Sequence, residues 1–306
     1  MICSKMSRMW IGTREGLWQL DGDRVLSVET FAGKTLTALA GSGARDWVIL
    51  DGRTLWEGDG SRWTQRATVD DHAATCLALT REGLWVGTEE AHLFRLAGDH
   101  LERIDSFETV DGRAAWYTPW GDPADVRSIS VSLDGAVYVN VHVGGVVRSR
   151  DGGRTFTPTV DIDSDVHQVL AHPSRAETVL AAAAEGFGVS RDGGASWRFV
   201  TEGLHAHYLR AVAASDDTVL VSASTGPGGR HAALYRGHLD ALELERCDDG
   251  LPQWFGDNVD TGCLAASGSL FVAGTEDGRV FRSLDGGRRW DVAAKGLPPI
   301  TCITVR

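Results

Sequence analysis

Short apolar segments of about five to eight residues recur along the whole chain, separated by turns rich in glycine and aspartate. They come in pairs, such as residues 124–131 with 136–141, residues 164–171 with 178–184, and residues 206–213 with 218–224. Segments of this length, separated by glycine and aspartate, are typical of β-strands joined by tight turns. No stretch shows the 3.6-residue period of an amphipathic helix. The pattern therefore predicts an all-β protein.

Three related turns follow such strand pairs, at Ser149–Phe156, Ser190–Trp197 and Ser283–Trp290. Each contains Asp-Gly-Gly between a short apolar strand and a segment ending in an aromatic residue. An aspartate can accept hydrogen bonds from turn amides, and glycine adopts positive φ without strain. We therefore interpret all three as hairpin turns.

The spacing of these turns defines a repeat. Asp151 and Asp192 are 41 residues apart, and Asp285 follows after 93 more, about twice that distance. Four short strands in each 40 to 45 residues is the period of a β-propeller blade. The chain begins with three strands and ends with an unpaired one, so we expect Ile300–Val305 to pair with Met9–Thr13 and close a seven-bladed ring. We expect residues 1–306 to form a single domain.

The sequence S-x-D-G-G-x-[ST]-[WF] in these turns resembles the Asp-box (BNR) repeat of sialidase-like and photosystem-assembly-factor-like propellers. The third copy departs from it, with Arg289 in place of Ser or Thr. The resemblance implies structural hairpins on the face opposite the ligand, and hence no catalytic role for their aspartates. It does not imply a sialidase, because the chain has four tyrosines, no Arg-Ile-Pro segment, and seven blades rather than six.

Composition and charge limit the kinds of partner and the cellular location that we expect for this protein. The formal net charge is −12, which disfavours nucleic acid and anionic membranes because no excess of Lys and Arg displaces counterions. No apolar run approaches the length of a bilayer span, and the first residues lack a secretory apolar segment. The five cysteines, Cys3, Cys76, Cys247, Cys263 and Cys302, show no CxxC spacing. We therefore expect a cytoplasmic monomer with buried, reduced thiols.

Two long connections should lie at the mouth of the propeller channel, where ligands bind to this fold. First strands are usually 38 to 42 residues apart, but two steps are 53 and 52 residues long. The extra residues include aromatic side chains, which we assign to ligand binding: Trp116, Tyr117, Trp120, Trp254 and Phe255. An aromatic wall for a sugar, planar ring or cation is one interpretation. The alternative, of equal weight, is that they plug the channel or cover a blade.

Polar residues gather where strands begin or end on the same face. The candidates for catalysis are His142, His167, His207, Asp165, Glu185 and Arg127. The candidates for ligand contact are Asp125, Asn258, Asp260 and Glu276. Asp125/Arg127 and Asp165/His167 share a spacing of two, so both members of each pair project to one side of a strand.

Two chemical hypotheses fit these residues. His142, His167 and His207, or His205 in place of His207, could hold one divalent ion such as zinc or manganese, with Asp165 or Glu185 as outer ligand or base. Alternatively, histidine and carboxylate form a metal-free acid–base pair while Arg127 binds an anionic group. The histidines elsewhere are interpreted as ordinary hydrogen-bonding residues: His72, His92, His100, His172, His231 and His238.

The chain contains no nucleotide-binding or redox-cofactor motif, no GxSxG and no HExxH. The leading hypothesis is therefore a hydrolase or lyase that acts on a small polar or aromatic molecule at the channel mouth. The competing hypothesis is a non-catalytic scaffold or assembly factor that binds a protein segment, for which the Asp-box resemblance also offers a precedent.

Overall fold

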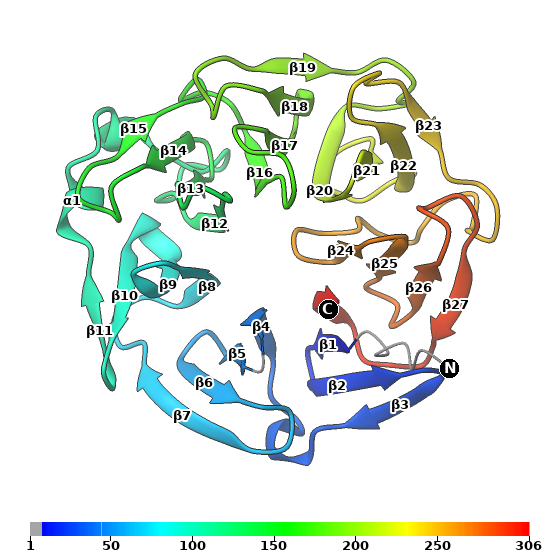
Figure 1. The fold of residues 1–306 in the computed structure, drawn as a ribbon, viewed down its shortest axis with the longest axis horizontal. Coiled ribbons are helices and arrows are strands. Elements are labelled where there is room, and N and C mark those ends of the chain that lie inside the picture. Colours follow the sequence, from blue (N-terminus) through cyan, green and yellow to red (C-terminus); the bar gives the residue numbers. More distant parts are fainter. Residues whose placement is uncertain (1–7, 44, 306) are drawn as a thin grey trace.

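The computed structural model describes residues 8–43 and 45–305, and these form a ring of seven four-stranded antiparallel sheets (Figure 1). Each sheet is one blade, with its first strand nearest the centre of the ring and its fourth at the periphery. The prediction of an all-β, seven-bladed propeller is confirmed.

The blades are numbered along the chain, and the first of them contains both ends of the ring. Blade 1 comprises β28 (Ile300–Val305), β1 (Met9–Thr13), β2 (Gly16–Asp21) and β3 (Arg24–Ser27). Blade 2 comprises β4 (Leu36–Ser42), β5 (Arg45–Leu50), β6 (Thr54–Gly58) and β7 (Trp63–Thr68). Blade 3 comprises β8 (Ala74–Thr80), β9 (Gly83–Thr88), β10 (Leu93–Ala97) and β11 (His100–Arg103). Blade 4 comprises β12 (Val126–Val131), β13 (Val137–Val141), β14 (Gly145–Ser149) and β15 (Thr157–Pro158).

The remaining three blades follow the same order. Blade 5 comprises β16 (Val166–Ala171), β17 (Val179–Ala183), β18 (Gly186–Ser190) and β19 (Arg198–Val200). Blade 6 comprises β20 (Tyr208–Ser215), β21 (Thr218–Ser224), β22 (Ala233–His238) and β23 (Leu244–Arg246). Blade 7 comprises β24 (Leu264–Ser267), β25 (Leu270–Gly274), β26 (Val280–Ser283) and β27 (Asp291–Ala294). The short helices in the described residues are η1 (Glu29–Phe31), η2 (Glu89–Ala91), α1 (Asp105–Glu108) and η3 (Arg113–Ala115).

The last strand closes the ring as the sequence predicts. β28 pairs antiparallel with β1, from Met9 opposite Val305 to Thr13 opposite Ile300. β28 therefore occupies the innermost place of a blade whose other strands come from the opposite end of the chain. This pairing covers the edge of β1 that would otherwise be unpaired.

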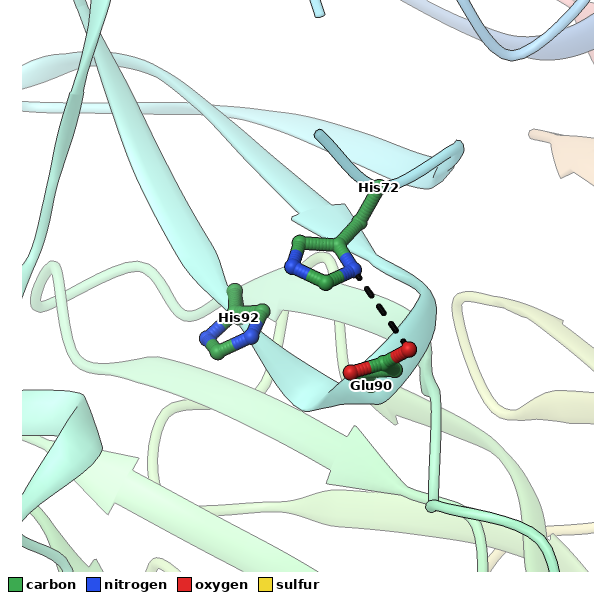
Figure 2. A group of neighbouring side chains, drawn as sticks. All are labelled: His72, Glu90 and His92. Atoms are coloured by element: carbon green, nitrogen blue, oxygen red, sulfur yellow. Dashed lines mark ion pairs between the residues drawn. The ribbon is translucent and has the colours of Figure 1, made fainter. Parts of the chain in front are cut away.

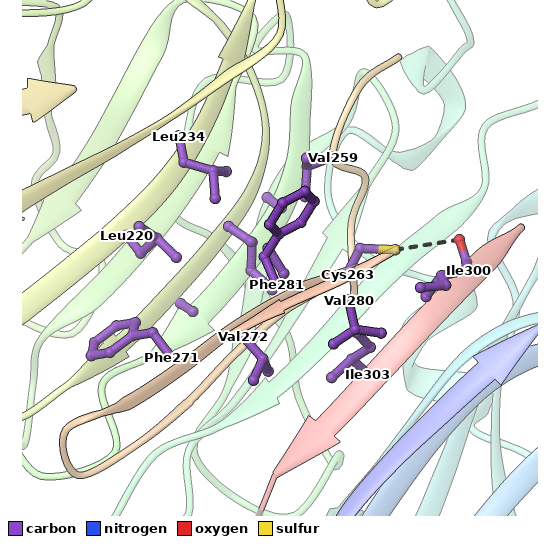
Figure 3. Packing of buried hydrophobic residues seen from close by; sticks show 14 of the residues in the cluster. Leu220, Leu234, Val259, Cys263, Phe271, Val272, Val280, Phe281, Ile300 and Ile303 are labelled. Carbon is purple, nitrogen blue, oxygen red and sulfur yellow. Dashed lines mark hydrogen bonds between the residues drawn. The ribbon is translucent and has the colours of Figure 1, made fainter. Parts of the chain in front are cut away.

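The apolar core lies between neighbouring blades, because each sheet has two faces and both are covered (Figure 1). Around the closure, Phe271 and Phe281 are each 1% exposed and belong to the same apolar cluster as Ile300 and Ile303 of β28 (Figure 3). The Cys263 thiol donates to the backbone carbonyl of Ile300, at a sulfur–oxygen distance of 3.7 Å. The cysteines within the described residues are unoxidised and buried, whereas Cys3 lies outside those residues.

The Asp-Gly-Gly turns have nearly the same hydrogen bonds in each copy. In the second, Asp192 accepts from the Ser196 amide at 2.9 Å and from its hydroxyl at 2.6 Å, and the Ser190 hydroxyl donates to the same carboxylate at 2.9 Å. These bonds hold the pKa of Asp192 down to about 2. Each such turn joins third and fourth strands, so it lies on the lower face, opposite the upper face at which the inner strands begin.

None of the helices in the described part of the chain has the length and hydrophobicity needed to cross a bilayer.

Candidate active site at the channel mouth

The inner strands of six blades carry a β-bulge near their start, close to the upper face. The strand register shifts there by one or two residues, and the bulged residues are Thr37, Thr75, Arg127, His167, Arg210 with Ala211, and Thr301. A bulge redirects a side chain that would otherwise alternate with its neighbours. The fold thus offers a comparable position near the channel mouth in each of these six blades.

Two of the threonines at this position connect blades. The Thr75 hydroxyl donates to the carbonyl of Val126 in the next blade, and the Thr301 hydroxyl donates in the same way to Leu36. Blades 4, 5 and 6 replace threonine with Arg127, His167 and Arg210. Charged or titratable groups therefore occupy one sector of an otherwise neutral ring.

A carboxylate lies between two imidazoles in this sector. Asp165 precedes β16, and its Oδ1 is 3.4 Å from His142 Nε2 while its Oδ2 is 3.3 Å from His167 Nε2. The His142 and His167 side chains are 4% and 0% exposed. His142 follows β13 of blade 4, in a turn whose next residue, Val143, has φ of 37°. The structure thus brings together three of the predicted catalytic residues.

The hydrogen bond on the far side of His167 determines which of its nitrogens carries a proton. Nδ1 contacts the backbone carbonyl of Leu209, which can only accept, so Nδ1 donates. In the neutral ring, Nε2 then carries the lone pair. Within the described part of the chain Nε2 has no hydrogen-bond partner of good geometry, although it points at Asp165. This nitrogen is therefore placed to accept a proton.

Burial and charge set the protonation states here. Burial lowers the pKa of His167, and the nearby Asp165 opposes that shift without reversing it. Burial alone would raise the pKa of Asp165, but its contacts with His142 and His167 outweigh this effect, and the pKa lies well below its usual range. At neutral pH the site therefore combines a carboxylate with a neutral His167 that can act as a base.

Arg127 has no charged partner at this site among residues 8–43 and 45–305. Its guanidinium has no hydrogen bond or ion pair with any described residue, although the side chain is half-buried. Its pKa is lowered by burial and then by the nearby Arg210, while Asp165 opposes this shift. An arginine brings five N–H donors in a planar fork. An incompletely hydrated guanidinium without a protein partner is a receptor for an anion.

Arg210 differs from Arg127 because its charge is neutralised. Its Nε donates to Asp260 at 2.8 Å, and its Nη1 donates to the Tyr208 hydroxyl at 3.2 Å. The Tyr208 ring in turn packs against His167, with ring centroids 4.6 Å apart. Asp260 is thus placed near the site, but as the partner of Arg210.

A cavity of about 320 Å³ opens beside these groups. Its lining includes Trp120, Asp125, Arg127 and His142, together with Thr75, Val126 and Thr261. Thr75, Arg127 and Thr261 also line a cavity of about 340 Å³ that extends along the inner strands. The pKa of Asp125 is raised by burial and, to a lesser extent, by Glu89. The cavity therefore has cationic, acidic and aromatic walls.

The aromatic residues predicted to form one wall lie in several different places. Trp120 packs edge-on against His142 with centroids 5.1 Å apart, and is 67% exposed. Tyr117 is 43% exposed. Trp116 packs instead against Phe107 and under the Arg113 guanidinium.

The second long loop follows the alternative interpretation, in which aromatic residues cover a blade. Trp254 packs against His205, His231 and Arg246. Phe255 is buried, and its ring contacts Phe281. Neither aromatic side chain lines the cavity beside Arg127.

Four polar candidates lie away from the His142–Asp165–His167 cluster. Asn258 donates to the Gly226 and Pro227 carbonyls, and Glu276 pairs with Arg14 at 2.7 Å. Glu185 and His207 are exposed, and neither forms an ion pair or side-chain hydrogen bond with another described residue.

The displacement of His207 has a simple geometric reason. The spacing that pairs Asp125 with Arg127 and Asp165 with His167 continues in blade 6 as Tyr208 and Arg210. His207 precedes that pair by one residue, and successive strand residues face opposite sides. Aligning Y-L-R with D-V-R and D-V-H would have identified Tyr208 and Arg210, which the prediction missed.

The predicted metal set is not assembled in the structure. The rings of His142 and His167 have centroids 6.4 Å apart, with Asp165 between them. Among the described residues, the three histidines do not bring three ligand atoms within 4.8 Å of one another, whereas another group does. The channel-mouth cluster therefore fits the metal-free acid–base hypothesis better.

The sequence matches no protein-family model and no curated protein. Solved structures resemble it in fold. The structure described as "YCF48 bound to D1 peptide" superimposes with a TM-score of 0.62 at 13% identity, over 88% of this chain and 85% of that one. The WD40 propeller domain of Doa1 gives a TM-score of 0.58 at 14% identity, over 90% and 82%.

Part of an enzyme structure is also similar in fold. The GH74 xyloglucanase from Xanthomonas campestris gives a TM-score of 0.61 at 16% identity, over 93% of this chain but only 46% of that one. The present chain thus spans less than half of that enzyme. At these identities the likeness shows the fold alone, a β-propeller, which these solved structures present in a xyloglucanase, in a protein bound to a peptide and in a WD40 domain.

Proposed function

We propose that the channel mouth binds a small molecule bearing an anionic group, and that Arg127 binds that group. The observation that carries this proposal is the half-buried guanidinium without a protein partner, beside a cavity of about 320 Å³. Leaving a buried charge unpaired is costly, so a protein that keeps one gains from the ligand that neutralises it. The exposed indole of Trp120 offers a flat surface next to the charged group.

We further propose that the bound molecule undergoes hydrolysis or elimination by proton transfer. The proton comes from water in hydrolysis or from a substrate carbon in elimination, and His167 accepts it at Nε2 by way of Asp165, which stabilises the imidazolium that forms. His142, on the other oxygen of Asp165, is the partner that returns a proton to the leaving group. Both reaction types need only an acid, a base and an anchor for the substrate, and the site offers all three.

The binding test uses a panel of small carboxylates and phosphate monoesters, aliphatic and aromatic, in a thermal-shift assay followed by calorimetry. The best ligand should bind Arg127→Gln about ten- to a hundredfold more weakly, the cost of a charged hydrogen bond. Arg198→Gln is the matched control, because Arg198 lies exposed on the outer strand β19. Equal binding by both variants would contradict the assignment of Arg127.

The catalytic test measures turnover of the best ligand class in Asp165→Asn and His167→Gln. Each should lower the rate by about a hundredfold or more, typical of lost general acid–base catalysis. Binding should change little. Undiminished turnover in both variants would contradict the roles of Asp165 and His167, and absence of turnover in the wild type would leave ligand binding without catalysis.

We also propose a second candidate function, binding of a protein segment on the upper face. Exposed Trp120 and Tyr117 favour it, and one structure of similar fold is described as bound to a peptide. In that case the small-molecule panel gives no stabilisation. A photoreactive residue at position 120 then cross-links one protein, whereas the same residue at exposed position 198 does not.

For the remaining properties, we propose that the three Ser-x-Asp-Gly-Gly turns are Asp boxes and that the chain is a cytoplasmic monomer of one domain. Support for the Asp boxes comes from their repeated hydrogen bonds at Asp151, Asp192 and Asp285. Free, buried thiols suit a reducing compartment.

A further inference from the structure

A second group of metal-binding side chains lies in blade 3, apart from the channel-mouth cluster. His72 lies in the loop before β8, and Glu90 and His92 lie in the turn between β9 and β10 (Figure 2). One ligand atom from each lies within 4.8 Å of the other two, and no other group among the described residues does so. His72 Nδ1 is 3.8 Å from Glu90 Oε1, and the two imidazole centroids are 4.5 Å apart.

The protonation of His92 is fixed by a neighbouring carboxylate. Its Nδ1 lies 2.9 Å from Glu108 Oε1, and an ionised carboxylate only accepts, so Nδ1 donates. The Nε2 lone pair of the neutral ring is then free for a cation. Arg113 orients Glu108 by donating to its other oxygen at 2.8 Å. A histidine backed in this way by a carboxylate is the usual outer shell of a protein metal site.

The backbone holds Glu90 beside His72 in an unfavourable conformation. Glu90 and Ala91 have φ of 57° and 52°, in the left-handed region that favours glycine. The Glu90 amide donates to Asp125 at 3.2 Å, and the Ala91 carbonyl accepts from Arg113 at 2.6 Å. Strain of this kind is retained where the surrounding structure imposes it, and it concentrates at functional sites.

We propose that His72, Glu90 and His92 bind one divalent transition-metal ion of the zinc type. Two imidazole nitrogens and one carboxylate oxygen form a donor set preferred by zinc and its neighbours, whereas calcium and magnesium take oxygen ligands. Bond lengths of about 2.0 to 2.2 Å place tetrahedral ligand atoms about 3.4 Å apart. Because Glu90 is 55% exposed, small side-chain rotations suffice to close the group from its present spacing.

The site has access to solvent and a place for a fourth ligand. His72 also lines a cavity of about 400 Å³ between β7 and β11, with Asp70, Asp71 and His100 on its walls. Three protein ligands with an open position describe a site that can exchange its ion or bind a further molecule.

The ion would also stabilise the loop that leads to the channel mouth. Glu108 and Arg113 belong to the connection between blades 3 and 4, which further along carries Trp120. Their bonds to His92 and Ala91 fasten that connection to the metal-binding turn. This inference goes beyond the proposed function and does not depend on it.

The test is calorimetric titration of the chelator-treated full chain with Zn²⁺ alone. We expect one equivalent to bind. His72→Ala and His92→Ala should weaken binding at least a hundredfold, and Glu108→Gln should weaken it ten- to a hundredfold by loosening His92. Glu90→Gln, at an exposed side chain, should also lose binding while keeping the metal-free Tm, which separates ligand loss from misfolding.

His100→Ala is the matched control, because His100 lines the same cavity without joining the group. It should bind zinc like the wild type, as should His142→Ala and His167→Ala. Absence of saturable binding, or equal weakening by His100→Ala, would overturn the proposal. Loss of zinc only in His142→Ala and His167→Ala would also overturn it, and would move the ion to the channel mouth.

Discussion

The upper rim of this propeller uses one backbone position in two different ways. In blades 1 and 3 the bulged residue is Thr301 or Thr75, and its hydroxyl bonds to the carbonyl of the following blade. In blades 4 to 6 it is Arg127, His167 or Arg210. The threonines connect neighbouring blades, whereas the second sector carries charged or titratable groups, of which Arg127 lines a cavity.

His167 combines the properties of both sectors. Like the threonines, it bonds to a carbonyl of the next blade, that of Leu209. Unlike them, it has a second nitrogen, and that nitrogen faces Asp165. A residue that connects two blades through one atom can thus serve chemistry through another. A threonine has a single hydroxyl, which the inter-blade bond uses, whereas a histidine has two ring nitrogens and keeps one for the site.

The largest expected effect is in the connecting sector, upon deletion of residues 299–306. This removes Thr301 and exposes the apolar partners of Ile300 and Ile303. Burial of each such side chain contributes roughly 1.5 to 3 kcal/mol, so Tm should fall by about 10 °C or more. Differential scanning calorimetry measures this. Adding the synthetic peptide of residues 299–306 should restore part of the loss, and an unchanged Tm would contradict closure by β28.

A smaller effect distinguishes the two sectors directly. Thr75→Val should lower the free energy of unfolding by about 1 kcal/mol, because it removes an inter-blade hydrogen bond. Arg127→Met should leave stability unchanged or raise it, because it replaces a half-buried charge without a partner. Urea denaturation of both variants makes the comparison. A loss above about 1 kcal/mol in Arg127→Met would mean that the guanidinium supports the ring.

The Asp-Gly-Gly turns should affect the stability of the fold but not binding at the upper face. Asp192→Ala should lower the free energy of unfolding by about 1 kcal/mol, through its lost bonds to Ser196. Anion binding at Arg127 should not change, since the turn lies on the lower face. Weaker binding at full stability would contradict that separation.

The smallest effect concerns pH. Because burial lowers the pKa of His167, the unfolded chain takes up a proton near pH 6.5 that the folded site resists. Stability is therefore complete above about pH 6.5 and falls as pH drops toward the folded pKa. Asp165, with its lowered pKa, contributes its full stabilisation above about pH 4, so its contribution is constant in this range.

The measurement is Tm at pH 7 and pH 5. The decrease in Tm should be smaller in His167→Gln than in the wild type. The decrease that remains is due to His172 and His205, whose pKa values burial also lowers. His238→Gln, at a 55% exposed side chain, is the control. Identical pH dependence in wild type and His167→Gln would exclude His167 as the source.

The sequence predicts the fold well because its signals are local and repeated. The three Asp-Gly-Gly turns and the unpaired last strand define the blade period and the closure without tertiary information. The candidate site is predicted less well, because it depends on which way each side chain points. His142, Asp165 and His167 are correctly brought together, whereas a one-residue offset separates His207 from the site.

The histidines of blade 3 show a second reason why a site cannot be predicted from the sequence. His72 and His92 are 20 residues apart, and nothing in that spacing is typical of a metal site. They meet because the turn at Glu90 and Ala91 adopts left-handed backbone at two residues in succession. A conformation imposed by Arg113 and Asp125, from a loop later in the chain, has no local signature.

The composite first blade has a consequence for the order of events during synthesis. Blades 2 to 7 are each built from consecutive strands, so each can assemble as it leaves the ribosome. Among the described strands, β1, β2 and β3 are translated before the others, yet their innermost neighbour β28 is translated nearly 290 residues after β1. Until then β1 exposes an unpaired edge that can recruit strands from other nascent chains. We therefore expect the early chain to depend on chaperones, and closure of the ring to be the last step of folding.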